Sequence, residues 1–231
     1  MRALIAGTSM LTSSAFDTWK ATSVPTPYGK VLLKKTAGYV FLQRHGERRV
    51  PPHSINHPAN IWALKSIGVS SVVAINSVGS LRPDLKPGTF MIPDDFFSPC
   101  NTPTFFDEEM KFTVPVMHES LARDLFRVCR SLGVSVSFGG TYVQTSGPRL
   151  ETRAEIRFFR QCGDVVGMTL ASEATLCMEQ QIPYASICSI DNYCNGIVTK
   201  ALTVTQIMRN VKKSVQTLER LVEALVKEKH R

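Results

Sequence analysis

The stretch Val69–Leu81, which reads VSSVVAINSVGSL, decides the fold. Its first half is apolar and rich in β-branched residues, which is typical of a buried strand. The strand then runs into a loop that contains Asn76, Ser77 and Gly79. In α/β proteins, ligands bind beyond the carboxyl ends of the strands, so this stretch predicts both a central strand and one wall of a binding site.

The same alternation continues on both sides of this stretch. Apolar runs predict further strands near 2–7, 39–46, 87–97, 137–147, 164–169 and 183–196. Helical spacing predicts helices near 56–68, 118–133, 153–163 and 171–181, and a long amphipathic helix from about Thr205, with Asn56 and Gly133 as end signals. Because strands and helices alternate without a linker or a repeat, we expect one α/β domain, residues 1–231, with a sheet between helices.

The composition is that of an ordinary globular protein, with 231 residues, 43% hydrophobic and 20% charged. There is no run of about eighteen apolar residues and the first strand is too short for a signal peptide, so we expect no membrane span and a cytoplasmic location. The net charge of +8 leaves a nucleic-acid-binding protein open as an alternative. The six cysteines show no metal-binding spacing, and we expect no metal and mostly buried, reduced thiols.

Polar or glycine-containing loops follow five of the predicted strands. Each such loop alone is a common turn or helix cap, but carboxyl ends of parallel strands meet at one edge of a sheet. Together the loops predict a pocket. They are Gly7-Thr8-Ser9, Arg44-His45-Gly46, Asn76-Ser77-Val78-Gly79, Met168-Thr169 and Asp191-Asn192.

Several segments, in order and spacing, resemble the trimeric purine nucleoside phosphorylase and methylthioadenosine phosphorylase family. They are RHG, PPHSIN with ANIWALKSIGV, VGSL with KPGTFMIPDDF, SGPRLETRAE, GDVVGMT and DNYCNG. The resemblance implies a nucleoside phosphorylase fold with a mixed, partly barrel-like sheet and a homotrimer. It also implies reversible phosphorolysis, in which phosphate attacks the anomeric carbon of a purine nucleoside and the base leaves, with inorganic phosphate as co-substrate and no other cofactor.

By resemblance, one set of residues holds the phosphate, and His45 also takes part in catalysis. A guanidinium, hydroxyls and loop N–H groups suit an anion. Asn76 and Ser77 stand where the family often has threonine and alanine, so we expect the backbone N–H of Asn76 to serve. The predicted phosphate-binding residues are Thr8, Arg44, His45, Asn76, Ser77 and Thr169.

The base and sugar sites are also assigned by resemblance. Gly167 and Met168 face the ribose, while Asn192, read as catalytic, and Glu151 contact the purine, with Leu150 and Tyr193 beside them. Glu151 follows the turn Ser146-Gly147-Pro148 and can accept from the N1–H that 6-oxopurines have and adenine lacks. Glu151 and Asn192 match the residues of the 6-oxopurine branch of the family.

At the 5′ end of the sugar, the resemblance places Val204, Ile207 and Met208 in an apolar wall, and no histidine lies between His118 and His230. An apolar wall can pack against a methylthio group but offers a hydroxyl no hydrogen-bond partner. S-methyl-5′-thioinosine is therefore the preferred substrate, followed by inosine and guanosine. These apolar residues fit the buried face of the last helix equally well.

Three other interpretations stay open at the level of sequence. They are an S-methyl-5′-thioadenosine phosphorylase, a basic nucleotide- or nucleic-acid-binding protein on the same scaffold, and a family member without activity. A serine hydrolase is disfavoured because no G-x-S-x-G motif occurs. The region Asp94–Pro115 is shorter than the resemblance leads us to expect, and the resemblance implies that in a trimer it reaches toward the site of a neighbouring subunit.

Overall fold

The strand predicted inside Val69–Leu81 lies at the centre of the sheet. In the computed structural model, which describes residues 1–100, 102–199 and 201–227, β5 (Ser71–Ser80) pairs in parallel with β1 (Arg2–Ala6) and with β11 (Tyr184–Tyr193). The far end of β5 also pairs antiparallel with β10 (Val165–Gly167). One strand thus borders three others: β1 along its first half, β10 at its carboxyl end and β11 along most of its length.

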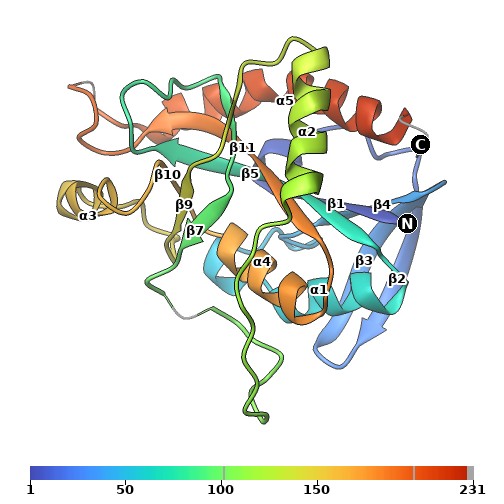
Figure 1. The fold of residues 1–231 in the computed structure, drawn as a ribbon. Helices are drawn as coiled ribbons and strands as arrows, with labels where there is room; N and C mark the ends of the chain where they lie inside the picture. The colour runs from blue at the N-terminus through green and yellow to red at the C-terminus, as the bar shows by residue number, and fades with distance from the viewer. Residues whose placement is uncertain (101, 200, 228–231) are drawn as a thin grey trace.

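Among the described residues, eleven strands form one mixed sheet, as predicted (Figure 1). One path runs β2-β3-β4-β1-β5-β10-β9-β7, and β11 leads from β5 to β6 and β8. The sheet therefore divides at β5 into two branches. The remaining strands are β2 (Lys20–Thr26), β3 (Gly29–Thr36), β4 (Tyr39–Gln43), β6 (Phe90–Ile92), β7 (Asp95–Phe97), β8 (Val136–Phe138) and β9 (Thr141–Gln144).

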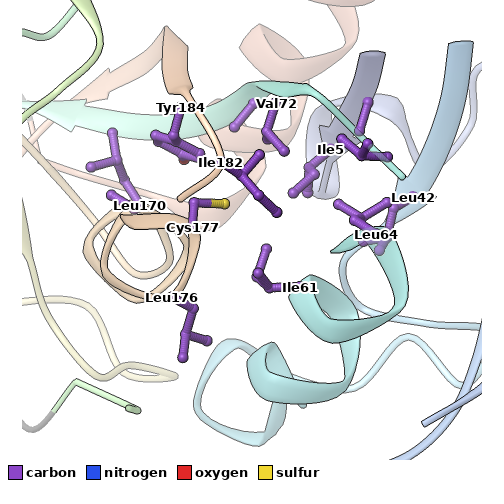
Figure 2. Packing of buried hydrophobic residues seen from close by; sticks show 14 of the residues in the cluster. Ile5, Leu42, Ile61, Leu64, Val72, Leu170, Leu176, Cys177, Ile182 and Tyr184 are labelled. Carbon is purple, nitrogen blue, oxygen red and sulfur yellow. The ribbon is translucent and has the colours of Figure 1, made fainter. Parts of the chain in front are cut away.

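Helices cover both faces of this sheet. Side chains alternate between the faces of β1: Ile5 packs in the cluster that contains α1 (His57–Ser66) and α4 (Leu170–Glu179), as Figure 2 shows. Leu4 packs in a second cluster with α2 (Glu119–Ser131) and α5 (Val204–Lys227). The other helical segments are α3 (Arg153–Phe159) and the short turns η1 (Thr8–Met10) and η2 (Pro52–Ser54).

The helix ends follow local chemistry. The Asn56 side chain accepts a hydrogen bond from the Ala59 N–H at 3.0 Å and starts α1, which confirms the predicted cap. Thr152 and Glu155 form a reciprocal capping box that starts α3 directly after Glu151. No helix within the described ranges is long and apolar enough to cross a membrane.

Three strand predictions were wrong in detail. The segment 87–97 divides into β6 and β7 around Pro93, which cannot donate to a sheet ladder. The segment 137–147 divides into β8 and β9 at Gly139 and Gly140, which both have positive φ. The hairpin of β2 and β3 was missed, because it lies at the sheet edge and carries many polar and charged residues.

Candidate active site

A cavity opens where β1, β4, β5, β10 and β11 end, and most of the predicted residues line it. Thr8 follows β1, Arg44 and His45 follow β4, and Met168 and Thr169 follow β10. The structure therefore brings together loops that are distant in sequence, as the position of ligand sites in α/β sheets predicts. The other predicted residues on the cavity wall are Ser77, Leu150, Glu151, Gly167, Asn192, Ile207 and Met208.

Arg44 supplies a fixed, buried positive charge. Its Nε donates to Glu173 Oε1 at 2.6 Å, its Nη2 to Glu173 Oε2 at 3.3 Å and its Nη1 to the Ile75 carbonyl at 2.9 Å. Tyr184 Oη donates to the same carboxylate at 3.0 Å. Burial opposes the charge of Arg44, but the attraction of Glu173 outweighs it and raises the pKa of the guanidinium. Two N–H groups of the guanidinium have no partner among the described residues and can serve an anion.

His45 lies beside Arg44 in its neutral form. Its Nδ1 is 2.7 Å from the Val50 carbonyl, which can only accept, so Nδ1 carries the hydrogen and Nε2 is left as an acceptor. Burial, and next the charge of Arg44, lower the pKa of His45, while the Val50 carbonyl opposes the shift. A Cβ on Gly7 would stand 2.5 Å from Arg44 Nη1 and 3.0 Å from His45 Nε2, so only glycine lets both groups reach this point.

The Asn76 side chain does not line the cavity. Any contact of Asn76 with phosphate would therefore use its backbone N–H, which is the contact that the sequence analysis expects. It is buried, donates through Nδ2 to Thr169 Oγ1 at 2.8 Å, and accepts from Ser186 Oγ at 2.6 Å through Oδ1. Its position in β5 turns it toward α4 and β11 instead. Ser77, the next residue, does line the cavity, and its buried hydroxyl faces the Asp191 carboxyl group, whose pKa it lowers.

Glu151 is placed by the corner that follows β9. Gly147 has a φ of 62°, and a Cβ there would come within 2.4 Å of Met168 Sδ, so the corner packs closely against the methionine. Thr145 Oγ1 donates to Glu151 Oε1 at 2.7 Å. The second carboxylate oxygen has no partner among the described residues, and it remains available to a ligand.

Asp191 is a site residue that sequence reasoning missed, although it was noted as part of a loop. It lies at a bulge in β11 between Ile190 and Asn192, is 1% exposed and lines the cavity. Ser189 Oγ donates to Oδ1 at 2.8 Å, while the buried Oδ2 has no partner in the described chain. Burial raises the pKa of Asp191 to about 6, and the Ser189 and Ser77 hydroxyls partly offset this shift. The signal was a carboxylate at the end of an apolar strand.

Two other predicted residues lie outside the cavity wall. Tyr193 points its hydroxyl to the Pro83 carbonyl at 3.0 Å, because side chains alternate along a strand and its neighbour Asn192 takes the inner face. Val204 starts α5 and is 67% exposed. Ile207 and Met208, one turn later, do line the cavity, together with the apolar residues Pro52, Leu202 and Val211.

Comparison with known proteins agrees with this geometry. A family model described as "Phosphorylase superfamily" matches residues 15–227. A probable S-methyl-5′-thioinosine phosphorylase of Methanocaldococcus jannaschii is 41% identical over 88% of this chain and 83% of its own length. A 6-oxopurine nucleoside phosphorylase of Pyrococcus furiosus is 40% identical over 88% and 84%. The structure of methylthioadenosine phosphorylase from Schistosoma mansoni in complex with adenine superposes with a TM-score of 0.86 at 26% identity, over 99% of this chain and 92% of that one.

Proposed function

Because this chain belongs to the phosphorylase superfamily, we propose that it catalyses the reversible phosphorolysis of purine nucleosides, with 6-oxopurine nucleosides as its substrates. The observation that supports this most strongly is the polarity of the cavity. The cavity is lined by a buried cation, Arg44, and the hydroxyls of Thr8 and Thr169, and also by the carboxyl groups of Glu151 and Asp191. Met168 lines the cavity as well and offers an apolar surface to the sugar.

The phosphate end is suited to deliver a nucleophile. Arg44 and the hydroxyls of Thr8, Ser77 and Thr169 can hold the oxygens of HPO₄²⁻, and the neutral Nε2 of His45 can accept its remaining hydrogen. A phosphate oxygen then attacks C1′ of the sugar while the bond from C1′ to purine N9 breaks. The electron pair of that bond moves onto the purine, so the other end of the cavity must stabilise a developing negative charge.

Asp191 is suited to that role. With a pKa of about 6, it is partly protonated near neutral pH, and its free Oδ2 can deliver a proton to purine N7 as the base leaves. The Asn192 amide lies next to it and donates one hydrogen to the Tyr193 carbonyl at 2.9 Å, which leaves the other for the purine. Protonation at N7 turns an anionic leaving group into a neutral base.

Glu151 supports the choice of a 6-oxopurine. The N1 position of hypoxanthine and guanine carries a hydrogen that a carboxylate can accept, whereas adenine N1 would face the carboxylate with a lone pair. The apolar wall around Ile207 and Met208 favours a methylthio group at the 5′ end over a hydroxyl. S-methyl-5′-thioinosine satisfies both preferences, and inosine and guanosine satisfy the first.

S-methyl-5′-thioadenosine is the second candidate, and Asp191 is the observation that favours it. An ionised carboxylate at this end of the cavity can accept a hydrogen from the 6-amino group of adenine. The two candidates therefore differ in which of two acidic residues dominates the recognition of the base.

The test is phosphate-dependent release of base from inosine, guanosine, S-methyl-5′-thioinosine and S-methyl-5′-thioadenosine, compared by kcat/KM. We expect the highest value for S-methyl-5′-thioinosine. A higher value for S-methyl-5′-thioadenosine would favour the second candidate. Salt-sensitive oligonucleotide binding without any release of base would contradict the enzymatic proposal and support the nucleic-acid-binding alternative.

We also propose that the protein assembles as a homotrimer. Between β7 and α2, the chain extends away from the body of the molecule (green, Figure 1) and carries alternate apolar residues that are 66–94% exposed. Such alternation over an exposed segment is what a protein interface would cover. The residues are Met110, Phe112, Val114 and Val116. A cytoplasmic location and a role in purine salvage remain predictions from the sequence.

A further inference from the structure

A hydrogen-bonded chain behind the phosphate end of the cavity links three side chains from different elements. Ser186 on β11 donates to Asn76 Oδ1 at 2.6 Å, and Asn76 on β5 donates through Nδ2 to Thr169 Oγ1 at 2.8 Å. Ser186, Asn76 and Thr169 are all buried, with exposed fractions of 0%, 1% and 7%. Only the last member of the chain, Thr169, lines the cavity.

The direction of this chain matters because a hydroxyl has a single hydrogen. Thr169 Oγ1 accepts from Asn76, so its own hydrogen is free to point elsewhere. Thr169 is the N-cap residue of α4, but its side chain makes no capping hydrogen bond in the described structure, and its backbone N–H donates to Tyr142 Oη at 3.2 Å. The hydroxyl hydrogen is therefore not used by the helix and is available on the side of the cavity.

We propose that Asn76 is a positioning residue for phosphate binding, which fixes the Thr169 hydroxyl so that it donates to the anion. Ser186 fixes Asn76 in turn, because its hydroxyl holds the amide oxygen and so turns the amide nitrogen toward Thr169. The inference rests on the proposed function, since the anion is the phosphate co-substrate. It differs from direct contact, because the Asn76 side chain never touches phosphate.

The decisive variant is Asn76→Asp, which keeps the shape of the side chain and removes its donor. The new carboxyl group can only draw the Thr169 hydrogen away from the cavity or leave Thr169 Oγ1 without its donor. We expect the KM for phosphate to rise roughly tenfold or more, because a hydrogen bond to a charged group is lost, while the KM for nucleoside changes little. In Asn76→Ala the hydroxyl hydrogen stays free to rotate toward the anion, and we expect a rise within about threefold.

A role in packing alone predicts the opposite order, since alanine leaves a cavity and aspartate does not. The matched background is Thr169→Val, which has the same shape as threonine and no hydroxyl. If Asn76 acts through that hydroxyl, Asn76→Asp adds little to the KM for phosphate in the Thr169→Val protein. If the added charge near phosphate caused the effect, the rise would persist in that background, and this result would overturn the proposal.

Ser186→Ala provides a second, milder variant, which keeps Asn76 and frees its amide to turn. We expect a smaller increase in the KM for phosphate than in Asn76→Asp. Wild-type KM for phosphate in all three of Asn76→Asp, Ser186→Ala and Thr169→Val would refute the positioning role and leave the proposed function standing. Wild-type turnover that does not depend on phosphate would refute both.

Discussion

Asp191→Asn tests the electrostatics of the base end through stability, without any assumption about substrate. Asp191 has a pKa of about 6 in the folded protein, against 3.8 for an ordinary aspartate. Between these values the folded state binds more protons than the unfolded state, so the Asp191 contribution to stability falls as the pH rises. The difference of roughly two pKa units corresponds to a penalty of about 3 kcal/mol that is complete above pH 7 and absent below about pH 3.

The asparagine cannot ionise, so the variant escapes this penalty. We expect the free energy of unfolding of Asp191→Asn, relative to wild type, to increase by about 2 kcal/mol between pH 4.5 and pH 8. Urea denaturation of both proteins at several pH values measures this difference, and constant effects of the substitution cancel in it. Ser189→Ala removes one of the hydroxyls that offset burial, so it should steepen the pH dependence of stability. Parallel curves for wild type and Asp191→Asn would show that Asp191 is ionised without penalty, and would remove it as a proton donor.

Three further predictions concern binding and assembly. Arg44→Ala should raise the KM for phosphate far more than the KM for nucleoside. It should also lower the free energy of unfolding by about 3–5 kcal/mol, because Glu173 is left buried without its cation. Equal effects on both KM values would contradict the assignment of Arg44 to phosphate binding. Glu151→Gln should lower kcat/KM for inosine roughly tenfold or more, and should lower kcat/KM for S-methyl-5′-thioadenosine much less. Equal losses for the two substrates would mean that Glu151 does not accept a hydrogen bond from purine N1–H. Phe112→Lys should shift the sedimentation coefficient from that of a trimer toward that of a monomer; a wild-type monomer with full activity would refute the assembly.

The elements that the sequence predicts well are those whose signal is local. The buried strands around Leu4 and Val73 are apolar over four consecutive residues, and the two pair with each other in the structure, as such runs predict. The position of the site at their carboxyl ends follows from the class of fold. The strand order and the division of the sheet at β5 do not follow from local patterns, because they depend on pairings between distant segments.

The orientation of side chains in the site depends on interactions far apart in the chain. The Asn76 side chain is held away from the cavity by Thr169 and Ser186, which lie 93 and 110 positions away, and the contact of its backbone N–H with phosphate stays a prediction. The resemblance assigned Asn192, and not its neighbour Asp191, to the purine. The bulge between Ile190 and Asn192 interrupts the alternation of side chains along β11, and Asp191 and Asn192 both line the cavity.

The two ends of the cavity differ in how firmly the fold holds them. At the phosphate end, Arg44 is tied to α4 through Glu173 and to β5 through the Ile75 carbonyl, and Thr169 is tied to β5 through Asn76. A substitution there disturbs the packing of the sheet against α4. At the base end, Glu151 lies on a loop, with one bond to Thr145, and Asp191 lies on a bulge. A substitution at Glu151 alters charge and hydrogen bonding without breaking a contact between helices or strands, so we expect the choice of purine to be the property that this scaffold changes most easily.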